Sequence, residues 1–191
     1  NVYPTAAITR GLHGEEMTEI GLLKNAGAVA FTDGRITIAN AQMQRRAMLY
    51  ASDFGALIVS ATQDAALAGA GVMNSGANAT RMGLPGIPRE AEIIPLERDM
   101  RLVAMTKGRY HAATLSVSDS IDVIAAAKKK GLDVTAGVAI ANLSLNDNDI
   151  GSYRTFFRVS PPLRGEDDRL ALIEGVRGGA LDVICSDHDP P

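Results

Sequence analysis

The residues best suited to chemistry lie at the ends of predicted strands. Asp187 and His188 follow the apolar segment 181–186, and Asp33 follows a second apolar segment, residues 27–31. Carboxylates that converge on the C-terminal edge of a parallel sheet can bind a metal ion or act as acid and base. Asp33 also precedes a glycine, and Asp-Gly is a frequent turn, so the pattern alone leaves its role open.

The other histidines and the cysteine favour structural roles. His13 lies in a glycine-flanked loop, and His111 lies near the middle of a predicted strand, where a hydrogen-bonded core histidine is common. Cys185, the only cysteine, lies within the last predicted strand, as a small core residue would. A single cysteine excludes a disulfide framework and favours a reduced, cytoplasmic setting.

The composition is that of a soluble globular protein with a substantial core. The 191 residues are 46% hydrophobic and 21% charged, and the net charge of -3 gives no reason to expect nucleic acid or an anionic membrane as a partner. No apolar run approaches the roughly 18 residues of a membrane span, and no signal peptide is expected. Phosphate-binding glycine loops, serine elbows and Cys-x-x-Cys pairs are also missing from the sequence.

Strand and helix patterns alternate along the chain, which predicts a parallel sheet with right-handed crossovers. The expected strands are residues 2–9, 27–31, 56–60, 110–115, 133–140 and 181–186. The expected helices are residues 15–25, 41–52, 90–107, 118–130 and 167–178, and the expected long loops are 69–88 and 141–166.

Six β/α units predict an α/β fold of the TIM (β/α)8-barrel type that is incomplete. A full barrel usually needs about 250 residues. Both ends of the sequence look cut, because a strand pattern begins almost at Asn1 and another ends just before Pro190. We therefore expect residues 1–191 to form a single partial barrel domain within a longer chain, with the first barrel strands outside it.

Short motifs spread over nearly the whole chain carry a resemblance to a known family. The chain resembles dihydroorotases of the amidohydrolase superfamily, of the long type related to allantoinases and hydantoinases. The motifs are Ile8-Thr-Arg-Gly with Glu15, Ala28-Val-Ala-Phe-Thr-Asp33, Gly71-Val-Met-Asn-Ser-Gly76, Gly83-Leu-Pro-Gly-Ile-Pro88 with Ala91-Glu92, Arg98-Asp99, Arg109-Tyr-His111, Ser160-Pro-Pro-Leu-Arg164 and Ser186-Asp-His188.

The resemblance implies a metal-dependent barrel with a small β-domain, which we expect to lie outside this chain. It implies reversible cyclisation of carbamoyl aspartate to dihydroorotate, in pyrimidine biosynthesis, at one or two zinc ions. Asp187 matches the catalytic aspartate at the end of the last strand, which is also a metal position. Asp33 matches the carboxylate ligand at the end of the fourth barrel strand.

The departures from the family pattern fall on the ligands. Ala61 and Thr114 stand where the resemblance places metal-binding histidines, and Ser160 stands at a substrate-contacting asparagine. Alanine has no donor atom, and a threonine hydroxyl is a poor zinc ligand beside an imidazole. The first-strand histidines of the family would precede Asn1. We therefore expect zinc binding to be weak or absent.

Two hypotheses follow from this pattern. One is a dihydroorotase-type cyclic amidohydrolase that is weakened or inactive through the lost histidines. The other is a non-catalytic homologue that serves as a structural partner of aspartate carbamoyltransferase, since some members of the family scaffold that enzyme. The motifs of the barrel framework are retained, whereas histidines expected as metal ligands are missing. This contrast favours a degenerate metal site. In either case we expect a homo-oligomer that binds neither nucleic acid nor membrane.

Overall fold

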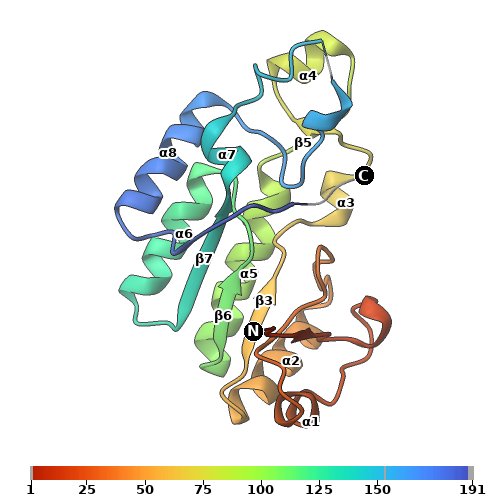
Figure 1. Ribbon diagram of the computed structural model, residues 1–191, viewed down its shortest axis with the longest axis vertical. Helices are drawn as coiled ribbons and strands as arrows, with labels where there is room; N and C mark the ends of the chain where they lie inside the picture. Colours follow the sequence, from red (N-terminus) through yellow and green to blue (C-terminus); the bar gives the residue numbers. More distant parts are fainter. Residues whose placement is uncertain (1, 153, 189–191) are drawn as a thin grey trace.

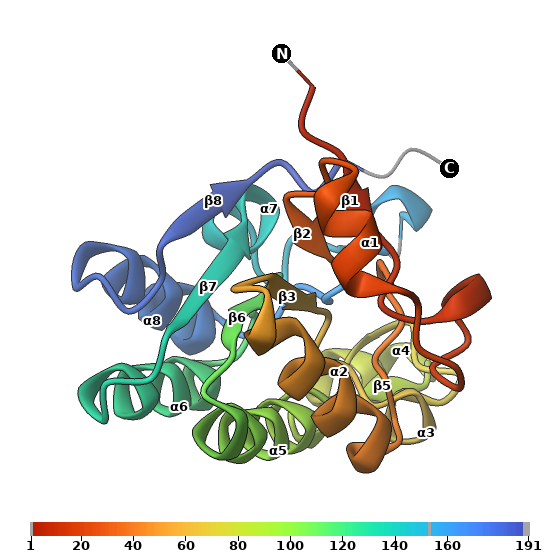
Figure 2. The ribbon, with the colours of Figure 1, turned by 90° about the horizontal axis from the view of Figure 1, so that it is seen from below.

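A computed structural model describes residues 2–152 and 154–188 of the chain. Its main sheet has six parallel strands in the order β1-β2-β3-β6-β7-β8. These strands are β1 (Thr5–Ala6), β2 (Ala30–Phe31), β3 (Leu57–Ser60), β6 (Arg109–Ala112), β7 (Val134–Ala139) and β8 (Val183–Cys185). The strands curve into an arc, in agreement with the incomplete barrel that the sequence predicts (Figure 2).

Helices cover the outer side of this arc (Figure 2). The longer ones are α2 (Ala41–Asp53), α5 (Glu90–Thr106), α6 (Ser118–Lys129) and α8 (Glu166–Arg177), and the shorter α1 (Ile20–Asn25) precedes β2. Asn40 caps α2, since its side chain accepts hydrogen bonds from the amides of Gln42 and Met43 at 2.9 and 3.1 Å. None of the helices in residues 2–152 and 154–188 is long and apolar enough to cross a membrane.

Alternate residues of each strand point to the helices, where the core lies. Ile58 of β3 and Tyr110 and Ala112 of β6 are each at most 1% exposed, whereas Val59 and His111 on the opposite face are only partly covered. The strands β6 and β7 approach closely at Gly137, where a Cβ atom would lie 2.4 Å from the Ala113 carbonyl oxygen. The pleat thus sends the large apolar side chains outward and the smaller or polar ones to the concave face.

Several short elements lie at the carboxyl end of the strands. They are α3 (Ala65–Ala68), β4 (Met73–Asn74), α4 (Ala77–Met82), β5 (Gly86–Ile87), α7 (Ile140–Ser144) and the 3-10 turn η2 (Thr155–Phe157). β4 and β5 pair as a separate two-stranded parallel sheet. Figure 1 shows α3, α4, β5 and α7 grouped at one end of the molecule. This end is the rim on which the predicted site residues lie.

The structure corrects several element boundaries. The first strand is Thr5–Ala6 instead of residues 2–9, and the first helix begins at Ile20 instead of residue 15. The loop expected over residues 69–88 contains β4, α4 and β5, and the loop expected over residues 141–166 contains most of α7 and the turn η2. Capping and backbone pairing within these loops are local features that the apolar pattern does not report.

Candidate functional site

The C-terminal rim of the sheet carries a cavity of about 720 Å³. Its wall combines two arginines, one carboxylate, an amide and hydroxyls with apolar side chains and two glycines. The lining residues are Arg35, Gln63, Ala68, Gly69, Gly71, Val72, Ile87, Thr155, Phe156, Arg158, Val159, Ser160 and Asp187. Clefts of this size at the carboxyl ends of parallel strands are typical ligand sites.

Two predicted site residues, Ser160 and Asp187, meet at Arg35. The Arg35 Nη1 donates to the Ser160 carbonyl oxygen at 2.8 Å, and Nη2 lies 3.3 Å from Asp187 Oδ1. Arg35 follows β2, and Asp187 follows β8, so three strands of the sheet separate their elements. Arg35 therefore joins the two sides of the arc across its mouth.

The backbone at Asp187 is in the left-handed region, with φ of 46°. Aspartate tolerates this conformation better than most residues, but it still costs about 1–2 kcal/mol for a residue with a side chain. Sparsely populated backbone conformations cluster at functional sites. His188, the next residue, is exposed and does not line the cavity.

Asp33 is 2% exposed and is committed to hydrogen bonds with the chain after β1. Its Oδ1 accepts from the amides of Ile8 and Thr9 at 2.8 and 2.9 Å, and its Oδ2 accepts from the Thr9 hydroxyl. The Thr9 hydroxyl oxygen in turn accepts from the Gly14 amide at 2.8 Å. Both carboxylate oxygens thus hold the loop after β1 against the end of β2.

These residues do not fit a catalytic zinc site. Asp33 uses both oxygens within the protein, Asp187 contacts a guanidinium, and the strand ends at Ala61 and Thr114 offer no imidazole. Within residues 2–152 and 154–188, no three His, Cys, Asp or Glu side chains come close enough to bind a metal ion. The predicted roles of Asp33 and Asp187 as ligands, of Asp187 in catalysis and of Ser160 in substrate contact remain predictions.

A buried polar cluster holds the wall of the cavity. Glu92 of α5, 3% exposed, accepts from the amides of Ser116 and Val117 and from the hydroxyls of Ser116 and Ser120. These contacts tie the N-terminal part of α5 to the turn between β6 and α6. Glu92 lies in one of the motifs that carry the resemblance, and in this structure it acts as the acceptor that orders that turn.

Arg164 extends the cluster to the two-stranded sheet. Its guanidinium donates to the Ser116 hydroxyl at 3.0 Å, to Asn74 Oδ1 at 3.0 Å and to the Ile87 carbonyl at 2.8 Å. Burial lowers the pKa of Arg164, and the nearby carboxylate of Glu92 acts in the opposite direction. Since Ile87 lines the cavity, Arg164 fixes part of the wall without facing the ligand space.

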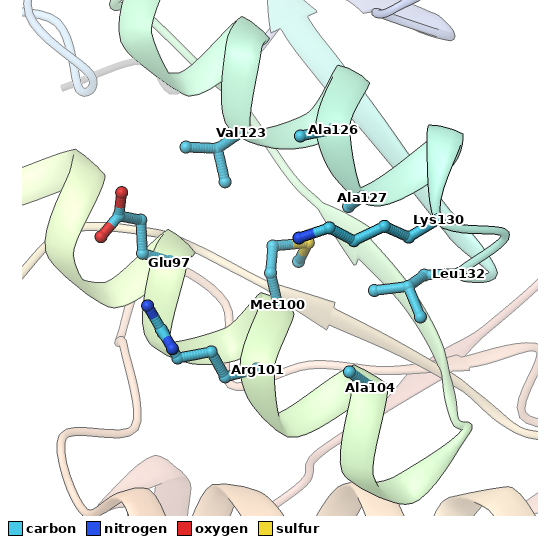
Figure 3. Close-up of a pocket in the computed structure, with 9 residues that line it drawn as sticks. All are labelled: Glu97, Met100, Arg101, Ala104, Val123, Ala126, Ala127, Lys130 and Leu132. Carbon is cyan, nitrogen blue, oxygen red and sulfur yellow. The ribbon is translucent and has the colours of Figure 1, made fainter.

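A second, smaller cavity of about 270 Å³ lies between α5 and α6, away from the rim. Figure 3 shows Met100 of α5 pointing toward α6, with Lys130 extended beside it and Glu97 and Arg101 at one end. None of the predicted site residues lines it. Its position on the outer helical layer separates it from the strand ends that carry the candidate chemistry.

The remaining reactive side chains of the sheet, Cys185 and His111, contact other residues of the sheet. Burial raises the pKa of the Cys185 thiol, and the neighbouring Asp187 acts in the same direction, so the thiol stays protonated. His111 Nδ1 lies 2.7 Å from the Thr135 hydroxyl, and burial lowers the pKa of His111. The contact of His111 with Thr135 agrees with the hydrogen-bonded role expected from the sequence, whereas Cys185 is only partly buried and is not the core residue that was expected.

Comparison with known proteins places the chain in a family. The dihydro-orotase-like family profile matches residues 1–120. The chain is 43% identical over 189 residues to a protein named dihydroorotase from Desulforapulum autotrophicum and 44% identical over 190 residues to another from Pelotomaculum thermopropionicum. The chain belongs to the dihydroorotase-like family. The two alignments cover 99% and 100% of this chain but 44% of each relative, so the chain spans less than half of their length.

Solved structures support the fold. The chain superposes on L-hydantoinase (dihydropyrimidinase) from Arthrobacter aurescens with a TM-score of 0.77 and 22% identity, over 95% of this chain and 42% of that one. D-hydantoinase from Bacillus sp. AR9 gives a TM-score of 0.76 and 19% identity, over 90% of this chain and 40% of that one. The predicted incomplete (β/α)8-type barrel is thereby confirmed.

Sequence reasoning missed the two arginines of the cavity. Arg35 lies two residues beyond Asp33, at a strand end, and this position could have marked it as a candidate. Arg158 lies two residues before Ser160, in a segment without a strand or helix pattern. Only the folded chain brings Arg35, Arg158 and Asp187 to one cavity.

Proposed function

We propose that the protein is a dihydroorotase-family cyclic amidohydrolase whose metal-dependent interconversion of carbamoyl aspartate and dihydroorotate is weakened or lost. The observation that supports this proposal is the set of side chains at the strand ends where the resemblance places metal ligands. Its strand ends present Ala61 and Thr114 in place of imidazoles, while the carboxylate of Asp33 is used by the loop after β1. A catalytic zinc ion is usually held by three protein ligands, of which histidine imidazoles are the most common.

Zinc content and dihydroorotate hydrolysis test this proposal on the same preparation. We expect zinc well below one equivalent by elemental analysis, together with turnover far below that of an intact dihydroorotase measured in parallel. Stoichiometric zinc with normal turnover would show that other ligands complete the site and that the proposal is wrong.

Restoring the missing imidazoles gives a sharper test. Loss of a residue that merely supports a metal ligand weakens metal binding about 10–100-fold, so Ala61→His combined with Thr114→His should strengthen zinc binding by at least roughly 100-fold. Ala104→His, on the exposed outer side of α5, is the control and should leave zinc affinity unchanged. An equal gain in the control would indicate nonspecific binding, and no gain in the double variant would contradict the proposed origin of the defect.

A structural role beside aspartate carbamoyltransferase is the second candidate. It is favoured by the contrast between the intact buried cluster around Glu92 and Arg164 and the altered ligand positions. A scaffold needs the barrel framework, whereas catalysis needs the ligands. Co-elution of the purified protein with aspartate carbamoyltransferase is the expected result, and separate elution at micromolar concentration of both would count against it.

A further inference from the structure

We propose that the smaller cavity, between α5 and α6, binds an aliphatic α-amino acid at a site separate from the rim. This cavity, the outer groove, has a volume of about 270 Å³ and lies on the outer helical layer. None of the residues assigned to metal, substrate or catalysis lines it. The inference therefore does not depend on the state of the metal site.

The two helices turn matching faces toward the outer groove. It is lined by positions 97, 100, 101 and 104 of α5, and by positions 123, 126, 127 and 130 at α6. Both sets follow the spacing i, i+3, i+4 and i+7, which is one side of a helix. Three of these positions are alanines, Ala104, Ala126 and Ala127, and their short side chains leave the groove open.

The charged side chains of the outer groove are not used within the protein. Glu97, Arg101 and Lys130 are exposed, and their side chains make no hydrogen bond or ion pair with another residue of the ranges 2–152 and 154–188. Lys128, by contrast, donates to both carboxylate oxygens of Asp182 at 2.8 Å. Lys130 is thus the lysine of the basic triplet that is free to meet a ligand in the groove.

Charges of both signs favour a zwitterion. Figure 3 shows Glu97 and Arg101 on the α5 side of the outer groove and Lys130 extending from the end of α6. The ammonium group of a ligand can pair with Glu97, and its carboxylate can pair with Arg101 or Lys130. A simple carboxylate would leave Glu97 unpaired, and a simple amine would leave both cations unpaired. An α-amino acid carries the two complementary groups on one carbon atom.

The uncharged part of the lining fits an aliphatic side chain. Met100 is 8% exposed, and Val123 and Leu132 are partly buried, so these residues present apolar surface beside the charged groups. A methionine side chain is flexible and adapts to the shape of its neighbours. The volume lies just below the range of about 300–1,000 Å³ for drug-sized ligands. The favoured ligand is therefore a small amino acid with a branched aliphatic side chain.

Four probes separate the features of this ligand. L-Leucine, 4-methylpentanoate and 3-methylbutan-1-amine share the branched chain but differ in their charged groups, and glycine keeps both charges without the side chain. We expect calorimetry or ligand-observed NMR to detect leucine binding, and each of the other three to bind at least about tenfold more weakly. Absence of leucine binding, or equal binding of any other probe, would overturn the inference.

A variant that fills the outer groove assigns the binding to it. Ala126→Leu should weaken leucine binding at least about tenfold, because the larger side chain occupies the space of the ligand. Ala125→Leu is the matched control, since Ala125 is exposed on the same helix and does not line the groove. Unchanged affinity in Ala126→Leu, or an equal loss in Ala125→Leu, would overturn the inference.

A charge variant tests the pairing of the ligand ammonium without a change of volume. Glu97→Gln should remove the preference for leucine over 4-methylpentanoate, since the two probes differ only in the ammonium group. Glu174→Gln, at an exposed position of α8 that pairs with Arg177, should keep that preference. Both substitutions lie on exposed helix surface, so the melting temperature should stay the same. A preference that persists in Glu97→Gln would contradict the proposed site.

Discussion

Asp99 shows how this fold accommodates a fully buried carboxylate. Its Oδ2 accepts hydrogen bonds from the Tyr110 hydroxyl at 2.9 Å and from Gln44 Nε2 at 3.3 Å, and Arg98 Nη2 lies 2.8 Å from Oδ1. Burial raises the pKa of Asp99, and the charge of Arg98 opposes that shift. The donors Tyr110 and Gln44 therefore stabilise α5 against β6 and α2, whereas Arg98 lies beside Asp99 within α5.

Tyr110→Phe removes one of these donors and should lower the free energy of unfolding by about 1–3 kcal/mol, because a buried acceptor loses a partner. Urea denaturation followed by circular dichroism measures the change. Tyr50→Phe is the matched control, since Tyr50 is only half-buried and its hydroxyl contacts no other described residue by hydrogen bond. Equal losses in both variants would contradict a specific role for the Asp99 contact.

His111 should make stability depend on pH on the acidic side. Burial lowers the pKa of His111 below its ordinary value of 6.5, with Asp182 acting in the opposite direction. The unfolded chain therefore binds a proton at a higher pH than the folded chain does. The contribution of His111 to the free energy of unfolding is complete above about pH 6.5. It is lost as the pH falls toward the pKa of His111 in the folded state, and the free energy of unfolding changes by at most about 1.4 kcal/mol per pH unit.

His111→Gln should abolish this component, which denaturation at pH 7.5 and pH 5.5 would reveal as a smaller difference between the two values. His13→Gln, at an exposed position, should leave the difference as it is in the unsubstituted protein. A pH difference that survives in His111→Gln would assign the effect to other groups.

At the scale of elements, Arg164 ties the segment before α8 to three other parts of the rim. It contacts Asn74 of β4, Ile87 of β5 and Ser116 after β6, and it is 3% exposed. Removal of one partner from a buried charged cluster leaves the other groups unsatisfied, which generally costs about 3–5 kcal/mol.

Arg164→Met should therefore lower the free energy of unfolding by about that amount and increase amide exchange in the segment between β4 and β5. Arg177→Met is the control, because Arg177 forms an exposed ion pair with Glu174 and should change stability by at most about 1 kcal/mol. A small loss for Arg164→Met, similar to the control, would show that the cluster contributes little to the rim.

The elements that the sequence predicted well are those with a strong apolar period. The helix expected over 118–130 is Ser118–Lys129, and the strand expected over 56–60 is Leu57–Ser60, because burial on one face imposes a clear pattern. The first strand was overestimated, since Val2 and Tyr3 are exposed by 91% and 71% despite their β propensity. Propensity without burial does not extend a strand.

At the scale of the whole molecule, the alternation of strands and helices predicted the incomplete parallel barrel but not which side chains meet at its open end. The strand ends that carry Asp33 and Asp187 were identified because parallel strands end at one edge. The use of Asp33 by Thr9, and the contact of Arg35 with Asp187, depend on side-chain positions in the folded chain. Sequence spacing carries no information on such contacts.

The contacts of Arg164 also bear on the order of events during folding. They join Arg164 to residues 90, 77 and 48 positions away in the chain, so they require β4, β5 and β6 to be in place already. Pairing between distant segments closes large loops and is slow. The Arg164 contacts should form after the rate-limiting step, so that Arg164→Met accelerates unfolding while the rate of refolding stays nearly the same.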